Sequence, residues 1–221
     1  MRTLNTEEEH TLIAATFYGV CTLNEYGLPN IHPQESPTIW RACRNAAMIT
    51  LLLDAGLRAA ELLKLEHNDL YFDNNPVNML TIPARVAKRH HPRDIPLSPR
   101  IRAALARYNR APLLIRDHPI VQPAFPYKPQ GHRLSTRQLQ RIVNTIGQRA
   151  LGIELYPHQL RHTFATKMMQ LTDIRTVQEL LGHKNVSSTQ IYTHTNSQDK
   201  RDAIAAMSKI SIPAPPFNSS M

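Results

Sequence analysis

The sequence predicts a mainly α-helical fold with one small antiparallel β-hairpin. Three observations lead to this prediction. Segments with helical periodicity and clear start signals fill most of the 221 residues, one short stretch has the β-prone composition of strands, and proline-rich segments separate these parts. The hydrophobic fraction of 42% is ordinary for a globular protein, so a chain of this length can bury one sizeable core.

The first third of the chain is predicted to contain three helices. Thr6 is a candidate N-cap before three glutamates, which favours a short helix that ends at about Tyr18. Residues 19–37 contain prolines and glycines that break the periodicity, so we expect an irregular loop. The apolar stretch 38–56 has the length of a buried helix that a glycine ends, and a further helix is predicted over residues 57–70.

The middle of the chain carries the predicted hairpin. Residues 78–99 contain β-prone pieces around Leu80 and Ile95 with a basic turn between them. Ser98 followed by Pro99 is a strong start signal for the next helix, because serine caps a helix and proline suits its first position.

The last part of the chain is again helical. After an irregular, proline-rich connection, helices are predicted over residues 135–150, 157–170, 173–181, 187–192 and 198–209. We therefore expect three parts: an N-terminal helix and irregular loop at 1–37, a main domain at 38–197, and a C-terminal helix with a disordered tail at 198–221.

The charge of the chain favours a polyanionic partner. Lys and Arg outnumber Asp and Glu by 26 to 17, a formal net charge of +9, and nucleic acid is the first candidate. An anionic membrane would also suit a basic protein, but no basic amphipathic helix stands out. With no apolar run of 18 residues and an N-terminus too polar for a secretory signal, we expect a soluble cytoplasmic protein.

Three side chains of the predicted helix 157–170 share one face, because helical geometry brings together residues three and four apart. They are His158, Arg161 and His162. Two histidines four apart occur in zinc sites, but Gln159 stands where the zinc motif has its glutamate, and Arg161 would repel a cation. Anion binding suits this set better, while His162 taken alone is more often a hydrogen-bonded core histidine.

Other candidate residues have ordinary structural explanations when each is taken alone. Arg58 and Glu61, three residues apart at a helix start, could form a surface ion pair worth a few tenths of a kcal/mol. His183 follows a glycine that ends a helix, and Tyr192 could simply pack against its neighbours. The order of the whole set is more informative than any one member.

That order is Gly-Leu-Arg-x-x-Glu-Leu, a basic hairpin, His-x-x-Arg, Leu-Gly-His and Tyr-Thr-His. It resembles the catalytic domain of the tyrosine recombinases, the phage-integrase and Xer-like family, over about residues 40–195. By this resemblance Arg58 and Arg161 clamp the phosphate, and Glu61 supports Arg58. Lys88 matches the hairpin lysine when "RDIPL" is aligned with the Arg-x-Val-Pro-Leu ending of the family, and the remaining matches are His158, His183 and the nucleophile Tyr192.

The resemblance implies a site-specific recombinase that cleaves and rejoins double-stranded DNA through a 3′-phosphotyrosyl link, with no metal, cofactor or ATP. It also implies a nucleoid-associated enzyme that assembles as a tetramer on paired sites, with its C-terminal helix docked on a neighbouring subunit. Docking of that helix on its own core is the alternative.

The chain also departs from the family pattern. Only about 39 residues precede Trp40, so we expect a short form without the separate N-terminal DNA-clamping domain, helped by an accessory protein or weaker in DNA affinity. Two other functions stay open: a catalytically idle DNA-binding regulator of the same fold, and an enzyme that relaxes supercoils like the type IB topoisomerases.

Overall fold

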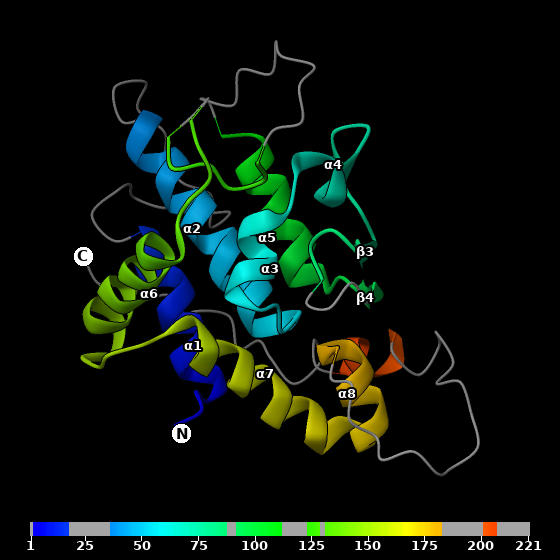
Figure 1. The fold of residues 1–221 in the computed structure, drawn as a ribbon. Coiled ribbons are helices and arrows are strands. Elements are labelled where there is room, and N and C mark those ends of the chain that lie inside the picture. Colours follow the sequence, from blue (N-terminus) through cyan, green and yellow to red (C-terminus); the bar gives the residue numbers. More distant parts are fainter. Residues whose placement is uncertain are drawn as a thin grey trace, which may run out of the picture.

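Helices account for most of the computed structural model (Figure 1). The structure describes residues 2–17, 36–87, 92–111, 123–128, 131–182 and 201–206. In these ranges the named helices are α1 (Thr6–Ala14), the 3-10 helix η1 (Ala15–Phe17), α2 (Ser36–Asp54), α3 (Ala59–Lys64), α4 (His67–Leu70), α5 (Pro99–Asn109), α6 (Thr136–Leu151), α7 (Pro157–Leu171) and α8 (Ile174–Leu181). Residues 201–206 are also helical and fall within the predicted final helix, whereas the predicted helix at 187–192 and the tail lie outside the described residues.

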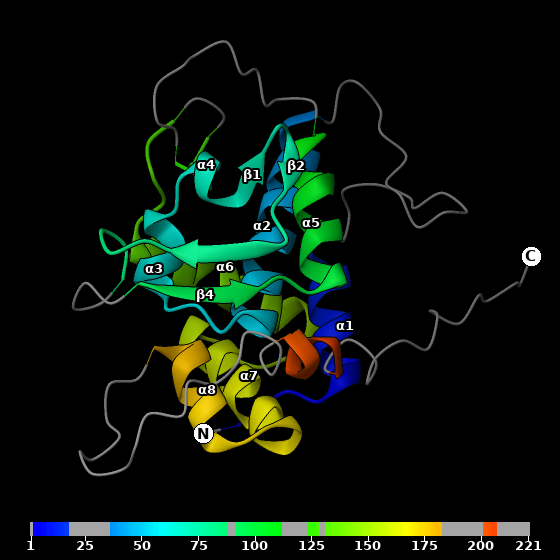
Figure 2. The ribbon, with the colours of Figure 1, turned by 90° about the vertical axis from the view of Figure 1, so that its right-hand side faces the viewer.

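Short strands form two separate antiparallel pairs in the described part of the chain. They are β1 (Tyr71–Phe72) with β2 (Asn75–Pro76), and β3 (Met79–Ile82) with β4 (Arg93–Pro96). Leu80 faces Ile95 in the second pair, both are fully buried, and Figure 2 shows β4 running next to α8. The predicted mainly α fold with a small antiparallel hairpin is confirmed. The β1–β2 pair is an addition that two-residue strands do not reveal in a sequence.

Helix α2 forms the centre of the core, because its neighbours cover it on several sides. Helices α1, α5 and α7 pack against it. Trp40, Leu51, Leu52 and Leu53 have no exposed surface. Consecutive leucines point in different directions around a helix, so α2 needs partners all round, and each buried leucine contributes about 2 kcal/mol. Among the described helices, none combines the length and apolar character that crossing a bilayer requires.

The single helix predicted over residues 57–70 is wrong, because the chain leaves the helix at Leu65. The ψ angle of Leu65 is 145°, and α4 begins only after Glu66. The carbonyl of Leu65 accepts the N–H of Ala124 at 2.9 Å, a long-range bond in place of a helical one. The N–H of Glu66 donates to the Asp69 carboxylate at 2.8 Å, which starts α4. Periodicity cannot reveal such distant partners.

Cap residues explain where the other helices begin. Ser98, Ser135 and Asp173 each accept a backbone N–H of the first turn of α5, α6 and α8, and of these Ser98 is the cap that the sequence predicts. The cap of α1 is Asn5 rather than the predicted Thr6, and its side chain accepts the N–H of Glu8 at 2.8 Å. Helix α1 therefore starts one residue earlier than predicted, and it gives way to η1 after Ala14.

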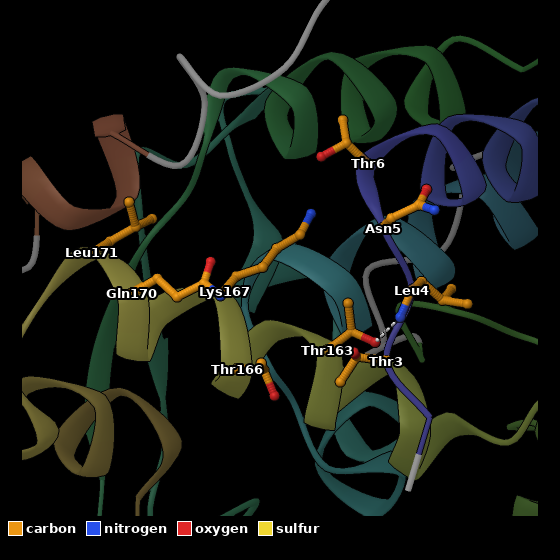
Figure 3. A pocket seen from close by; sticks show the side chains of 9 residues that line it. All are labelled: Thr3, Leu4, Asn5, Thr6, Thr163, Thr166, Lys167, Gln170 and Leu171. Carbon is orange, nitrogen blue, oxygen red and sulfur yellow. Dashed lines mark hydrogen bonds between the residues drawn. The ribbon is translucent and has the colours of Figure 1, made fainter.

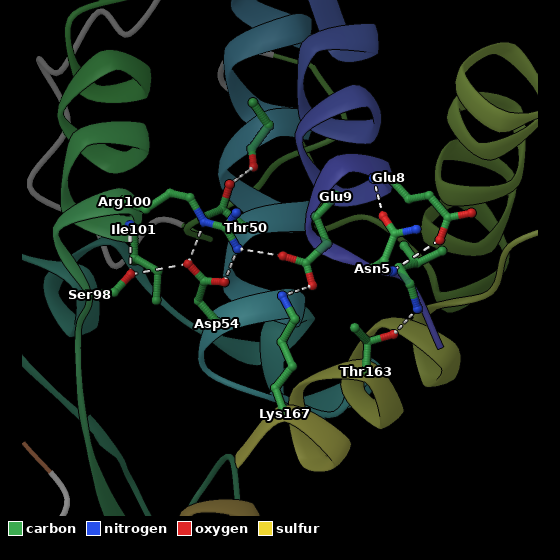
Figure 4. Close-up of polar contacts among 12 residues, drawn as sticks. Asn5, Glu8, Glu9, Thr50, Asp54, Ser98, Arg100, Ile101, Thr163 and Lys167 are labelled. Atoms are coloured by element: carbon green, nitrogen blue, oxygen red, sulfur yellow. Dashed lines mark hydrogen bonds and ion pairs between the residues drawn. The ribbon is translucent and has the colours of Figure 1, made fainter. Parts of the chain in front are cut away.

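Ion pairs connect α1 to the core (Figure 4). Glu9 of α1 has no exposed surface, yet it pairs with Lys167 of α7 and, at 3.1 Å, with Arg100 of α5. Arg100 also donates through Nε to Oδ2 of Asp54, at the end of α2, at 2.7 Å. Burial alone would lower the pKa of Arg100, but Asp54 and Glu9 outweigh it and raise that pKa. The network ties α1 to three other helices.

A cavity of about 280 Å³ lies between the N-terminal segment and α7 (Figure 3). Its lining includes Lys167 and Thr163, and Oγ1 of Thr163 accepts the N–H of Leu4 at 3.1 Å. Residues 163, 166, 167 and 170 lie on the face of α7 away from Arg161, since each residue turns the helix by about 100°. The cavity is therefore separate from the arginine cluster described next.

Candidate active site

The turn between α2 and α3 positions Arg58. Gly56 has a φ of +58°, which lets the chain turn sharply after α2, and Arg58 then caps α3 in an extended conformation. The N–H of Arg58 donates to Oε2 of Glu61 at 2.9 Å, and its Nη1 donates to Oε1 at 2.8 Å. Glu61 is 1% exposed, so the carboxylate of this pair is buried, whereas spacing alone indicates a surface pair.

Arg161 reaches the same place from α7. The residue is 6% exposed. Nη1 donates to the carbonyl of Gly56, and Nη2 donates to the carbonyl of Leu181 at 2.8 Å. Burial lowers the pKa of Arg161 to about 10, the charges of Arg58 and Arg93 act in the same direction, and Glu61 opposes them. The guanidinium therefore stays charged at neutral pH.

The C-terminal end of α8 connects three arginines. Its consecutive carbonyls of Leu180, Leu181 and Gly182 accept from Arg93 Nε at 2.8 Å, Arg161 Nη2 at 2.8 Å and Arg58 Nη2 at 3.1 Å. Carbonyls at a helix C-terminus lack intrahelical donors and carry the negative end of the helix dipole. Cations are favourable there, so the helix end and the arginines position each other.

Arg93 is the member of this cluster that the motifs did not identify. It stands at the start of β4 with a side chain 7% exposed. Its Nη1 and Nη2 donate to the two carboxylate oxygens of Glu61 at 3.0 and 2.8 Å. The signal in the sequence is the arginine of "RDIPL", which by the resemblance only marks the alignment of Lys88. Its partner lies 32 residues away, so no local pattern reveals the contact.

Glu61 is ionised because of these arginines. Burial would raise the pKa of its carboxyl, but the hydrogen bonds and charge of Arg93, together with the bonds from Arg58, outweigh burial and lower the pKa to about 2. Within these four residues, three guanidinium groups face one carboxylate, an excess of two positive charges. Arg58 is 24% exposed, so part of this charge faces solvent. The arrangement suits an anion with several oxygens, such as a phosphate.

Helix α7 also carries the two histidines that the sequence singles out. His158 lies in its first turn and is exposed, and His162 is half-buried. In the part of the chain that the structure describes, no group of three or more His, Cys, Asp or Glu side chains could hold a metal ion. Three predicted site residues lie outside the described residues: Lys88, His183 and Tyr192. The structure thus brings together Arg58, Glu61 and Arg161, places His158 on the same helix as Arg161, and adds Arg93.

Comparison with known proteins finds one family. The sequence model of the phage integrase family matches residues 33–199. The chain is 38% identical over 164 residues to the tyrosine recombinase XerC of Chromohalobacter salexigens, covering 73% of this chain and 52% of that protein. It is 39% identical over 159 residues to the XerC of Haemophilus ducreyi, covering 70% of this chain and 49% of that protein. The chain thus spans about half the length of these relatives.

Solved structures show the same fold at lower identity. The XerA recombinase superposes with a TM-score of 0.62 at 24% identity, covering 97% of this chain and 67% of that one. The integrase of mycobacterium phage Brujita gives 0.62 at 21% identity, covering 98% and 61%. The XerH site-specific recombinase bound to its difH substrate gives 0.57 at 21%, covering 96% and 53%.

Proposed function

Since the chain belongs to the phage integrase family, we propose that it is a site-specific tyrosine recombinase that cuts and rejoins double-stranded DNA. One observation carries this proposal: Arg58 and Arg161, 103 residues apart in sequence, donate to adjacent carbonyls at the end of α8 and share a buried positive cluster. A phosphodiester oxygen would find two fixed guanidinium groups there.

The proposed reaction needs no metal and no ATP. The phenolic oxygen of Tyr192 attacks the scissile phosphorus, the bond to the 5′ oxygen breaks, and a 3′-phosphotyrosyl link forms. Lys88 donates a proton to the departing 5′ oxygen, and His158 accepts the proton of the tyrosine. The 5′ hydroxyl of a second strand then reverses these steps, so the energy of the phosphodiester is kept in the covalent link.

Arg58, Arg161 and His183 have a different task in this proposal. Negative charge develops on the non-bridging oxygens as the phosphorus becomes five-coordinate, and these three side chains would donate hydrogen bonds to them. Removing one such donor costs about 3 kcal/mol of transition-state stabilisation, on the order of a hundredfold in rate. Glu61 and the end of α8 hold the first two donors before DNA arrives.

Trapping the covalent intermediate tests the proposal directly. The protein is incubated with sheared DNA of its host, denatured with detergent, and the DNA that stays attached is sequenced to identify the cut site. A duplex of that site, nicked beside the cut so that rejoining fails, is expected to give a protein–DNA band on a denaturing gel. Tyr192→Phe lacks the nucleophilic oxygen and is expected to give no band; a band from this variant would identify another nucleophile.

The covalent band, together with a native gel and a plasmid-relaxation assay, distinguishes the alternative functions. An idle DNA-binding regulator would shift DNA on a native gel without forming the covalent band. A topoisomerase-like enzyme would relax a supercoiled plasmid that lacks the trapped site. A metal-dependent hydrolase built on His158 and His162 would lose activity in EDTA, whereas we expect the covalent band to form equally well with the chelator.

The partners are part of the proposal as well. Double-stranded DNA is supported by the net charge of +9 and by the XerH relative, whose structure holds its difH substrate. Pairing two sites requires several subunits, so we propose a tetramer that assembles through the C-terminal end of the chain, with an accessory protein assisting DNA binding. The described residues 201–206 pack on the chain's own core, where Ala203 and Ile204 are buried. Action on chromosomal DNA would place the protein at the nucleoid.

A further inference from the structure

Arg93 joins three elements that meet at the proposed active site. It starts β4, its two terminal nitrogens contact both oxygens of Glu61 in α3, and its Nε donates to the carbonyl of Leu180 in α8. The two bonds to Glu61 measure 3.0 and 2.8 Å, and the third measures 2.8 Å. Its side chain is 7% exposed, and all three of its guanidinium nitrogens already donate within the chain, to Glu61 and Leu180.

Glu61 transmits the position of Arg93 to Arg58. Its Oε1 accepts from Nη1 of both arginines, at 2.8 Å from Arg58 and 3.0 Å from Arg93. A forked guanidinium fixes the plane of a carboxylate, because both oxygens are engaged at once. The plane of Glu61 in turn sets the direction in which Arg58 points.

Arg93 also supports the end of α8. A Cβ atom added to Gly182 would lie 3.0 Å from Nη1 of Arg93, so the guanidinium packs directly against this residue. The carbonyl of Gly182 accepts from Arg58, and that of Leu181 accepts from Arg161. Both phosphate-facing arginines are therefore bonded to a helix end that Arg93 holds.

We propose that Arg93 is a positioning residue for strand cleavage: it fixes Glu61 and the C-terminal end of α8 so that Arg58 and Arg161 converge on one phosphate. This inference rests on the proposed recombinase function. An arginine is required at this position. Its three guanidinium nitrogens donate to two separate groups, the carboxylate of Glu61 and the carbonyl of Leu180, whereas a lysine presents one point charge.

Arg93→Lys is the variant that tests this inference, with Arg85→Lys as its control. Arg85 makes a comparable contact with Glu66 and Asp69, but it is 45% exposed and bonds neither Glu61 nor α8. We expect Arg93→Lys to retain wild-type circular dichroism and DNA affinity within about threefold, and to form the covalent band about tenfold to a hundredfold more slowly at saturating protein. Arg85→Lys is expected to cleave at the wild-type rate.

Two further measurements distinguish positioning from mere stabilisation. If Arg93 acts through Glu61, Arg93→Lys is expected to slow cleavage far less in a Glu61→Gln background than in the wild type. Equal slowing in both backgrounds would contradict the inference. A substrate whose 5′ bridging oxygen is replaced by sulfur needs no proton for its leaving group, so it is expected not to rescue Arg93→Lys. Rescue would mean that Arg93 serves the leaving-group acid rather than the arginines.

Failure of the inference and failure of the proposed function give different results. A wild-type rate for Arg93→Lys, beside a covalent band that Tyr192→Phe abolishes, would overturn the inference and leave the recombinase function intact. Absence of a Tyr192-dependent band from the wild type would overturn the function and this inference with it.

Discussion

The contact of Glu61 with two arginines shows how burial changes what an ion pair contributes to the structure. Spacing correctly predicts that Arg58 and Glu61 meet, but it cannot show that Arg93 meets them as well. An exposed pair three residues apart contributes a few tenths of a kcal/mol. A carboxylate that is 1% exposed and bonded to two guanidinium groups is instead a fixed part of the interior.

Glu61 makes stability depend on pH in an acidic window. Its pKa is about 2 when folded and near 4.5 when unfolded, so its contribution, about 3 kcal/mol, is fully present above the higher value and is lost as pH falls toward the lower one. We expect Glu61→Gln to unfold at lower urea concentration at pH 6, with the difference from wild type shrinking between pH 4.5 and 2. A difference independent of pH would contradict this assignment.

At the scale of elements, the joint between α2 and α7 depends on a residue without a side chain. Gly56 ends α2 at a φ of +58°, and a Cβ there would lie 2.3 Å from Cδ1 of Phe164 in α7. The same residue offers its carbonyl to Arg161. Close packing of the two helices and placement of the arginine therefore share one position.

Gly56→Ala tests this joint against a matched glycine. An alanine at this position would have to adopt a left-handed backbone conformation, and its Cβ would clash with Phe164. Together these two effects are expected to lower the free energy of unfolding by about 3 kcal/mol. Gly152 has a φ of +67°, but a Cβ there would meet nothing within 4 Å, so Gly152→Ala is expected to cost only about 1 kcal/mol. Urea denaturation of both variants measures the difference, and equal losses would show that the contact with Phe164 is unimportant.

The elements that sequence patterns located correctly are those with local causes. Ser98, Ser135 and Asp173 cap their helices through bonds within one turn, so their sequence neighbours suffice to place them. The break at Leu65 has a distant cause, since Ala124 supplies the partner of its carbonyl. The same distinction holds for the site residues. The order of the motifs predicts Arg58, Glu61 and Arg161, whereas the contacts of Arg93 with distant residues are visible only in the structure.

At the scale of the whole molecule, buried charge links the N-terminal segment to the body of the fold. Residues 2–17 lie outside the segment that matches the family, yet Glu9 contacts cations from two different helices. Lys167 lies on the far side of α7 from Arg161, so its contact with Glu9 holds α7 without taking part in the arginine cluster.

Removal of this carboxylate is expected to destabilise the entire protein. Glu9→Ala leaves Lys167 and Arg100 without one of their acidic partners in a largely buried place, at a cost of about 3 kcal/mol. Glu7→Ala changes an exposed glutamate of the same helix and is expected to change stability by less than about 0.5 kcal/mol. Thermal unfolding of the two variants compares them, and similar melting temperatures would show that α1 contributes little.

Three neighbouring carbonyls at the end of α8 accept from three different arginines. A slide of this helix by one residue would offset all of these bonds together, because consecutive residues lie about 100° apart around the helix axis. Intermediate alignments would satisfy none of them well. A displacement of α8 would therefore disturb Arg58, Arg93 and Arg161 together rather than one at a time.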